Sequence, residues 1–453
     1  MRLITLCGAL LLTAISSAAQ TPVLKTQSGK VSGVVENGVC VYKGIPYAAP
    51  PVGDLRWKLP QPAEHWKGIR KCDTFGPASL QGGSAEGSFY WKEFYQGGAP
   101  AMSEDCLYLN VWTPAPGTSD KLPVMLWIHG GAYMNGYGHE IEFGGEAYAA
   151  HGVILVTLNY RLGMCGFLAH PLLDEENGGK GSGNYGLYDQ LAAIRWVHEN
   201  ISAFGGDPDN ITIFGQSAGA GSVQALISSP LTKGLVSKAI IQSGGGLGGI
   251  ISATPLADAE AKGKSMWDTA GMTTLEQMRA CPADKFNDVL GTYMMKQKTF
   301  TGLPYGPCID GTLLVDSLDG IAREGKELDI PYMIGFTSED IAPDVMKKAA
   351  VDWSLLLESQ GRHPAYVYRF SRDLPGEDNM QAGGFGDMKG AFHSSELWYM
   401  FGTLGRCWRP MEQHDFDLSE RMVRYWTDFA KTGCPSQDWA PCTSTNQNIM
   451  ELK

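Results

Sequence analysis

The sequence predicts an α/β fold in which a large, mainly parallel central sheet is flanked by helices. Two observations lead to this prediction. Residues 153–159, 211–214 and 238–242 are short, almost continuously apolar runs, as expected for strands buried on both faces. Residues 185–204 lie between the first two runs and carry apolar side chains at helical spacing. Strands that alternate with helices in this way form parallel sheets covered by helices.

The other elements follow in chain order. Valine-rich segments at 29–35 and 38–42, joined by a turn at Glu36-Asn37, predict an N-terminal hairpin. An apolar run at 123–126 predicts a buried strand that ends in a glycine-rich loop. Further downstream the pattern predicts two strands and one helix, at 331–337, 365–370 and 394–404.

The composition predicts one globular body. The chain has 453 residues, of which 43% are hydrophobic and 19% charged, and it shows no internal repeat or low-complexity linker. We therefore expect residues 20–453 to form a single domain. The formal net charge of −12 argues against nucleic acid and anionic membrane surfaces as partners.

The first 19 residues have the pattern of an export signal. Arg2 precedes an apolar run at 3–14, and Ser17-Ala18-Ala19 offers the small residues that a signal peptidase accepts. We expect cleavage after Ala19 and a secreted or periplasmic protein. The apolar run is too short to span a membrane, and no later segment approaches about 18 uninterrupted apolar residues.

A Gly-x-Ser-x-Gly motif predicts a nucleophile. The apolar strand at 211–214 runs into Gly215-Gln216-Ser217-Ala218-Gly219, and a small-residue helix follows. Ser217 would lie at the tip of a tight strand-to-helix turn, where glycines let the neighbouring backbone pass close by. A serine hydroxyl held there can attack a carbonyl carbon.

A second glycine cluster predicts the groups that stabilise the resulting anion. Gly130 and Gly131 follow the strand that begins at 123, where their N–H groups can approach a substrate. Together with the amide of Ala218 they supply three donors for an oxyanion hole. Losing one such donor costs roughly 3 to 4 kcal/mol of transition-state stabilisation.

The acid of a catalytic triad should follow the nucleophile in the chain and precede the histidine. After the strand at 331–337 the sequence offers Glu339 and Asp340, with Asp344 one turn further. A carboxylate is needed to fix the tautomer of the imidazole and to stabilise its cation. The residues alone leave these alternatives open.

The base is chosen by position. Three histidines lie downstream of the candidate acids: His363, His393 and His414. His363 precedes the strand at 365–370 and so lies at the wrong end of it, and His414 is in a charged segment that looks solvated. His393 follows that strand, at the start of the helix expected over 394–404, and is the predicted base.

With these pieces assembled, the chain resembles the type-B carboxylesterases, the cholinesterase-like branch of the α/β-hydrolases. The resemblance covers nearly all of the sequence after the signal. It is carried by these motifs: Gly44-Ile45-Pro46-Tyr47-Ala48, Pro50-Pro51-Val52-Gly53, Ser103-Glu104-Asp105-Cys106-Leu107-Tyr108-Leu109-Asn110-Val111-Trp112, His129-Gly130-Gly131-Ala132, Phe204-Gly205-Gly206-Asp207-Pro208 and Gly215-Gln216-Ser217-Ala218-Gly219.

The resemblance implies an α/β-hydrolase fold and a serine carboxylesterase that needs no cofactor. It implies Ser217 as nucleophile, His393 as base and Asp340 as acid, with Gly130, Gly131 and Ala218 as oxyanion donors and Ser243 as a hydroxyl beside the triad carboxylate. It also implies structural ion pairs of Arg56 with Glu104 and of Arg161 with Asp189.

The chain has 10 cysteines. We expect Cys72 and Cys106 to form a disulfide. The bridge would close a loop of about 35 residues and stabilise the fold by roughly 3 to 4 kcal/mol. The resemblance supports the same pair.

Three departures from the family pattern bear on the site. Most members carry Glu where Asp340 stands, which leaves Glu339 as a rival acid. Cholinesterases carry Glu before the nucleophile, and the neutral Gln216 here removes a charge that would favour a quaternary ammonium group. Only about fifty residues separate Asp340 from His393, which predicts a reduced cap over the sheet.

The substrate expected is a small-molecule ester. Phe89, Tyr90, Trp91, Phe94 and Tyr95 lie in the loop between Cys72 and Cys106, either as an aromatic wall of the site or as rings that pack the loop onto the body. Short acyl or aryl esters fit an open site, with feruloyl and related hydroxycinnamoyl esters of plant polysaccharides as a subset. The rival hypothesis is a non-catalytic, cholinesterase-like binding or adhesion protein. No motif predicts a metal or a nucleotide.

Overall fold

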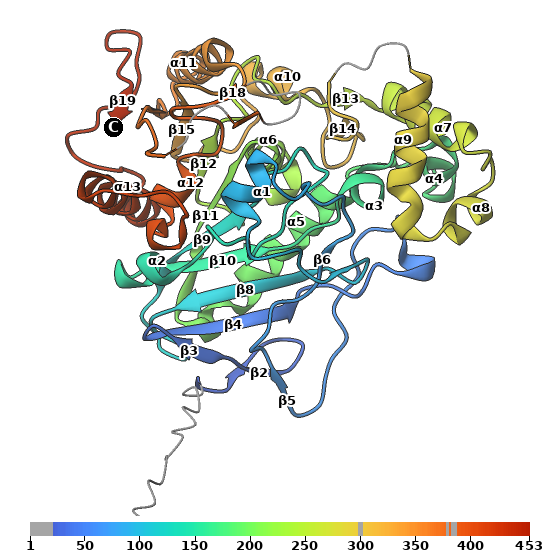
Figure 1. Ribbon diagram of the computed structural model, residues 1–453, viewed down its shortest axis with the longest axis horizontal. Coiled ribbons are helices and arrows are strands. Elements are labelled where there is room, and N and C mark those ends of the chain that lie inside the picture. The colour runs from blue at the N-terminus through green and yellow to red at the C-terminus, as the bar shows by residue number, and fades with distance from the viewer. Residues whose placement is uncertain (1–20, 298–301, 377–379, 382–386) are drawn as a thin grey trace, which may run out of the picture.

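The computed structural model describes residues 21–297, 302–376, 380–381 and 387–453, and its centre is a ten-stranded sheet (Figure 1). In the order in which they lie side by side, the strands are β19 (Met450–Leu452), β16 (Tyr366–Phe370), β15 (Tyr332–Thr337), β12 (Lys238–Gln242), β11 (Gly206–Gln216), β9 (Leu122–Ile128), β10 (Ile154–Leu158), β8 (Tyr108–Thr113), β4 (Val39–Pro46) and β3 (Val34–Glu36).

The sheet is mixed and mostly parallel. All neighbours from β19 to β10 pair in parallel, whereas β8, β4 and β3 are joined to β10 and to one another by antiparallel pairing. The parallel part has both faces covered, because the crossover connections between parallel strands place helices there. This is the α/β-hydrolase fold, as predicted.

Alternation along the strands divides the core into two layers. In β9, Val124, Leu126 and Ile128 face one hydrophobic cluster, whereas Met125 and Trp127 face the other. The same alternation in β11 and β12 follows from the two-residue period of a strand. Both clusters are built from side chains with almost no exposed surface, so each face of the sheet is sealed by helices.

Helices cover both faces. The first cluster receives side chains from α5 (Tyr185–Asn200), α6 (Ala218–Ile227) and α11 (Pro343–Ser359), and the second from α2 (Glu146–Ala150), α12 (Leu397–Met400) and α13 (Gln413–Thr432). The remaining α-helices are α1 (Phe89–Phe94), α3 (Gly163–Phe167), α4 (Pro171–Glu176), α7 (Leu256–Thr269), α8 (Leu275–Ala280), α9 (Phe286–Lys296) and α10 (Leu318–Arg323). Figure 1 shows α4, α7, α8 and α9 gathered beside the sheet, on the side away from α13.

Short 3-10 helices and small sheets complete the described chain. The 3-10 helices are η1 (Gly53–Leu55), η2 (Ile201–Phe204), η3 (Pro230–Thr232), η4 (Ala283–Lys285) and η5 (Leu404–Arg406). The small sheets consist of β1 (Leu24–Lys25), β2 (Lys30–Ser32) and β5 (Ile69–Lys71); β6 (Ala78–Ser79) and β7 (Met102–Ser103); β13 (Thr254–Pro255) and β14 (Cys308–Ile309); and β17 (Met380–Gln381) and β18 (Asp387–Met388).

Most predicted elements are confirmed, and one is corrected. β12 has the predicted bounds, α5 and η2 together span the predicted helix 185–204, and β3 pairs with β4 in the predicted N-terminal hairpin. The helix predicted over 394–404 is wrong in extent, because α12 covers only Leu397–Met400. Ser394 has a φ of 80°, in the left-handed region, so the chain cannot enter a right-handed helix directly after His393.

The expected disulfide between Cys72 and Cys106 is wrong, since both residues are free, buried thiols. The two thiols have different surroundings. The Cys106 thiol lies near Asp189 and Cys165, and burial raises its pKa well above the usual value. Burial raises the pKa of Cys72 to about 12, and its charged neighbours are Arg70 and Asp73.

The export signal predicted over residues 1–19 lies outside the described residues. Among the helices that the structure does describe, none is long and apolar enough to serve as a membrane span.

Candidate active site

The nucleophile elbow forms where β11 ends and α6 begins. Ser217 stands between them with φ 57° and ψ −124°, a strained conformation for a residue with a side chain. A Cβ on Gly215 would lie 2.6 Å from the carbonyl carbon of Gly219, and one on Gly219 would lie 2.1 Å from the carbonyl oxygen of Ile128. Glycine is therefore required on both sides, as predicted.

This crowding predicts a large loss of stability for Gly219→Ala. The added methyl group would overlap the backbone of β9, which cannot move without disturbing the sheet. We expect the free energy of unfolding to fall by at least about 3 kcal/mol, measured by urea denaturation.

Gly291→Ala is the matched control for Gly219→Ala. Gly291 lies in α9, where an added Cβ would meet no atom within 4 Å. Because alanine is the better helix former, this variant should be about 0.5 to 1 kcal/mol more stable than the wild type. Equal stability of the two variants would show that the elbow is not tightly packed.

The predicted oxyanion loop lies against the elbow. A Cβ on Gly130 would be 3.2 Å from Cβ of Ser217, and one on Gly131 would be 2.1 Å from the carbonyl oxygen of Asn135. Gly131 has a φ of 98°, and its carbonyl accepts from the amides of Met134 and Asn135, each at 2.9 Å. The turn thus holds the Gly130 and Gly131 amides beside the nucleophile.

His129 stabilises this loop through contacts of its ring and its carbonyl with Tyr160. Its ring stacks on Tyr160 at a centroid distance of 4.4 Å, and the Tyr160 hydroxyl donates to the His129 carbonyl at 2.9 Å. Burial lowers the pKa of His129 to about 4, so the ring is neutral at neutral pH. Its role is to fix the backbone from which Gly130 and Gly131 project.

Asp340 is the carboxylate that meets His393, three residues beyond the end of β15. Its Oδ1 accepts from Nδ1 of His393 at 2.5 Å. The amide of Thr337 donates to Oδ2 at 3.1 Å and that of Ile341 to Oδ1 at 2.9 Å, which fixes the carboxylate. Glu339, the rival acid, is exposed, and its backbone instead bridges to Phe392. The geometry thus favours Asp340.

His393 is buried next to the elbow, and its contacts place it between Asp340 and Gln216. Nε2 of Gln216 lies 3.2 Å from Nε2 of the ring and 3.5 Å from Nδ1. Ser217 makes no hydrogen bond to the imidazole in this structure, although its neighbour in sequence does. Nδ1 of His393 faces Asp340, so Nε2 is the ring nitrogen that would accept a bond from a serine hydroxyl. In this structure the Gln216 amide contacts Nε2 instead.

The charges of this pair stabilise each other. Burial alone would raise the pKa of Asp340, but the charge of His393, its hydrogen bond and other donors hold that pKa below the usual value. Burial alone would lower the pKa of His393, but the charge and hydrogen bond of Asp340 raise it above 6.5. Ser243 is fully buried near Asp340 and has a φ of 52°. The Ser243 hydroxyl helps to lower the pKa of Asp340, although this hydroxyl makes no hydrogen bond of ordinary geometry.

Glu396 is a residue of the site that the sequence reasoning missed. It is fully buried three residues after His393, and burial, followed by the charge of Asp340, raises its pKa to about 7. Its negative charge in turn contributes to the raised pKa of His393. The signal in the sequence was a carboxylate three positions after the candidate base.

Glu396 predicts a change in the pH dependence of turnover. The imidazole must be neutral to accept a proton, so activity falls as pH falls through the pKa of His393. Glu396→Gln removes a charge that favours the imidazolium, so the acid limb of kcat/KM should move to lower pH. Glu339→Gln replaces a nearby exposed carboxylate by a neutral amide, and it should leave the acid limb of kcat/KM at the same pH. A limb that stays fixed or moves to higher pH in Glu396→Gln would contradict this coupling.

The aromatic residues of α1 divide between the two expected roles. Phe89 and Phe94 are buried and pack onto the body, against Phe392 at 4.9 Å and Trp398 at 5.9 Å between ring centroids. Tyr90, Trp91 and Tyr95 are half-buried. Trp91 and Tyr95 line a small cavity of about 70 Å³ together with Asn135 and Tyr137 of the chain that follows the oxyanion loop.

The two ion pairs implied by the resemblance are present. Arg56 makes two hydrogen bonds to Glu104, at 2.7 and 2.6 Å, and Arg161 makes two to Asp189, at 2.8 and 2.7 Å. Arg161 and Asp189 are almost fully buried. Bidentate pairs of this kind fix the relative orientation of the segments that carry them.

Comparisons with known proteins point to one family. The sequence pattern of the carboxylesterase family matches residues 20–351 and 339–453. A fumonisin B1 esterase of Sphingopyxis macrogoltabida is 40% identical over 94% of this chain and 85% of its own length. A para-nitrobenzyl esterase of Bacillus subtilis is 35% identical over 92% of this chain and 91% of its own.

Solved structures agree with the sequence relatives. A PNB esterase structure superposes with a TM-score of 0.80 at 31% identity and covers 95% of both chains. A carboxylesterase of Geobacillus stearothermophilus superposes with a TM-score of 0.77 at 31% identity, over 95% of this chain and 96% of its own. The chain therefore belongs to the carboxylesterase family and is a carboxylic ester hydrolase of the serine esterase type.

Proposed function

We propose that Ser217, His393 and Asp340 form the catalytic triad of this esterase and that the enzyme acts on short-chain acyl or aryl esters. The observation that carries the proposal is the 2.5 Å hydrogen bond between His393 and Asp340, made beside the strained elbow that presents Ser217. Three groups from distant parts of the chain meet at the carboxyl ends of β11 and β15, where α/β sheets bind ligands.

In the acylation step, Oγ of Ser217 attacks the ester carbonyl carbon while Nε2 of His393 takes the hydroxyl proton. The Gln216 amide must first yield this nitrogen to the serine hydroxyl. Asp340 stabilises the imidazolium that forms. The carbonyl oxygen becomes an oxyanion that accepts hydrogen bonds from the amides of Gly130, Gly131 and Ala218. When the tetrahedral intermediate collapses, the alcohol leaves with the proton from His393.

In the deacylation step, water repeats the attack on the acyl-enzyme. His393 accepts a proton from water, the hydroxide adds to the acyl carbon, and the same amides stabilise the second oxyanion. Return of the proton to Ser217 releases the carboxylic acid and restores the free enzyme. Every step uses only groups of the chain, the ester and water.

The preference for short or aryl esters is supported by the half-buried rings of Trp91 and Tyr95, which line a small cavity with residues that follow the oxyanion loop. Flat aromatic groups stack on such rings. Feruloyl and other hydroxycinnamoyl esters, including those linked to plant polysaccharides, are a subset that would use this stacking.

A substrate series tests this preference. The kcat/KM of p-nitrophenyl esters with acyl chains of increasing length should be highest for the short chains, and methyl ferulate should also be hydrolysed. Highest activity on long-chain acyl esters would overturn the short-ester proposal while leaving ester hydrolysis itself intact.

Export after cleavage behind Ala19 stays a prediction of the sequence. Mass spectrometry of the protein recovered outside the cytoplasm would test it, since a mature chain that begins at Gln20 is expected. An intact N-terminus would contradict the assigned cleavage site.

A further inference from the structure

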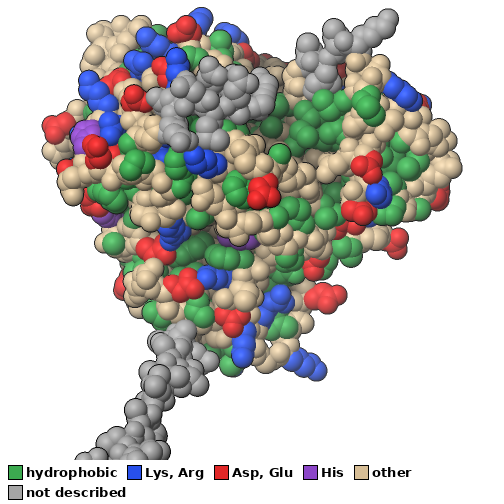
Figure 2. All heavy atoms as spheres, viewed as in Figure 1, with side chains coloured by type: hydrophobic (Ala, Val, Ile, Leu, Met, Phe, Trp, Pro, Cys, Tyr) green, Lys and Arg blue, Asp and Glu red, His purple; other side chains and the backbone are tan. Residues whose placement is uncertain are grey.

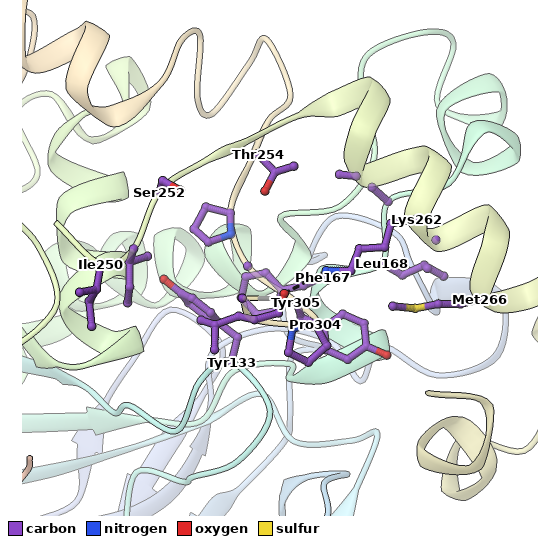
Figure 3. A pocket seen from close by; sticks show the side chains of 18 residues that line it. Tyr133, Phe167, Leu168, Ile250, Ser252, Thr254, Lys262, Met266, Pro304 and Tyr305 are labelled. Atoms are coloured by element: carbon purple, nitrogen blue, oxygen red, sulfur yellow. Dashed lines mark hydrogen bonds between the residues drawn. The ribbon is translucent and has the colours of Figure 1, made fainter. Parts of the chain in front are cut away.

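A cavity lies one helical turn from the nucleophile. It has a volume of about 290 Å³ and is bordered by the loop around Tyr133, the chain around Ile251, the helix α7 and the chain around Tyr305 (Figure 3). Figure 2 shows hydrophobic side chains gathered on the surface where Figure 1 places β13 and β14, the strands that follow Ile251 and Tyr305.

Two of its walls rest directly on the helix that follows Ser217. A Cβ on Gly221 would lie 2.6 Å from the Tyr133 hydroxyl oxygen and 2.5 Å from Cγ2 of Ile251. The Gly221 amide donates to the Ser217 carbonyl at 3.0 Å, so these contacts fall on the first turn of α6. Ser217 itself does not line the cavity, whose walls contact α6 four residues after the nucleophile.

The lining combines apolar side chains with polar groups such as Ser252 and Thr254, and it contains one charged side chain. Of the 18 residues drawn around the cavity, Lys262 alone is ionisable to a full charge at neutral pH, and its side chain reaches from α7 into the cavity (Figure 3). Phe167, Met266 and Tyr305 are buried apolar neighbours. Lys262 is half-buried at the cavity, so water screens its charge less than that of a fully exposed lysine.

The position of Lys262 is fixed by its surroundings. Its Nζ donates to the carbonyl of Leu303 at 2.9 Å. The next residue, Gly263, packs so tightly that a Cβ there would lie 1.9 Å from the carbonyl oxygen of Ala169. This close contact packs α7 directly against the chain at Ala169, which also lines the cavity, and the bond to Leu303 orients the ammonium group.

We infer that this cavity is a specificity subsite for esters that carry a carboxylate, and that Lys262 is the residue that selects them. The apolar walls accept the hydrocarbon part of the substrate, and the ammonium group pairs with its carboxylate. This inference rests on the proposed function, because it names the substrate class of the same active site.

The net charge of the protein makes this lysine informative. With a formal charge of −12, the chain as a whole repels anions. A positive group in a cavity whose walls contact α6 is therefore a local exception to the general charge. The positive charge of Lys262 repels a substrate that carries a quaternary ammonium group, and the neutral Gln216 does not attract such a group either.

Matched esters test the inference. In the acyl arm, 4-nitrobenzyl hydrogen glutarate is compared with its neutral methyl ester at the distal carboxyl. In the alcohol arm, 4-carboxybenzyl butanoate is compared with 4-(methoxycarbonyl)benzyl butanoate. We expect the ratio of kcat/KM for the charged over the neutral ester to fall by roughly tenfold to a hundredfold in Lys262→Met, in one of the two arms.

The ratio is measured within each variant, so a general loss of folded protein cancels. Lys262→Arg should retain part of the ratio, because the positive charge remains. Lys264→Met is the matched control: Lys264 lies on the same helix, pairs with Asp268 and is 56% exposed. That control should keep the wild-type ratio in both arms.

The outcomes separate the two proposals. A ratio that is the same in wild type and Lys262→Met in both arms would overturn the lysine subsite while the esterase function stands. Failure of the wild type to hydrolyse any of the four esters, neutral ones included, would count against the proposed short-ester function itself. The arm in which the ratio falls identifies whether the acyl or the alcohol group occupies the cavity.

Discussion

Ser217→Ala is expected to lower kcat for a short p-nitrophenyl ester by roughly six orders of magnitude, or about 8 kcal/mol. The residual rate would come from the oxyanion amides and substrate binding alone. Alanine keeps the Cβ of serine, so the strained backbone at φ 57° is preserved and only the attacking oxygen is lost. Steady-state kinetics with purified protein, normalised to folded enzyme, measures this loss.

His393→Ala should cost about as much as Ser217→Ala, and the double variant should be no worse than either single one. The reason is that a nucleophile without its base and a base without its nucleophile are equally disabled. His414→Ala, which removes an exposed histidine of α13, serves as the control and should keep wild-type turnover. Multiplicative losses in the double variant would contradict a Ser-His unit.

Asp340→Asn is expected to lower kcat by roughly four orders of magnitude, or about 5 kcal/mol. The amide keeps the size of the side chain and one of the two oxygens, so one of the bonds from the Thr337 and Ile341 amides can remain. What is lost is the negative charge that holds the proton on Nδ1 and stabilises the imidazolium.

Glu339→Gln is the control for Asp340→Asn, because the two carboxylates are adjacent in the chain while only one faces His393. This variant should retain turnover within about twofold of the wild type, as is usual for an exposed side chain outside the site. A severe loss in Glu339→Gln with a mild one in Asp340→Asn would show that the acid has been misassigned.

The fold was largely predictable because its signals are local. β12 contains the apolar run 239–241 and α5 has a clear helical period, and both begin at the residue that the pattern indicated. The helix after His393 could not be predicted, because the left-handed conformation of Ser394 is imposed by its surroundings. That Cys72 and Cys106 are both free thiols could not be predicted from their spacing, because spacing does not fix how two segments approach each other.

The site shows the same division. The elbow around Ser217 and the loop at Gly130 are short motifs that can be recognised by their glycines, which permit close backbone contacts. The structure places the two motifs in contact. The pairing of His393 with Asp340 rather than Glu339 depends on which carboxylate faces inward after β15. The raised pKa of the buried Glu396 and the contact of Gln216 with the imidazole arise only when the segments that carry Gln216, Asp340 and His393 meet.

Labelling with a fluorophosphonate tests the central claim most directly, because the reagent bonds covalently to an activated serine. After incubation with the wild-type enzyme, peptide mass spectrometry should find one adduct, on the peptide that contains Ser217, together with loss of esterase activity. Ser217→Ala should remain unlabelled. An adduct on another residue, or full activity after labelling of Ser217, would contradict the assignment of this serine as the nucleophile.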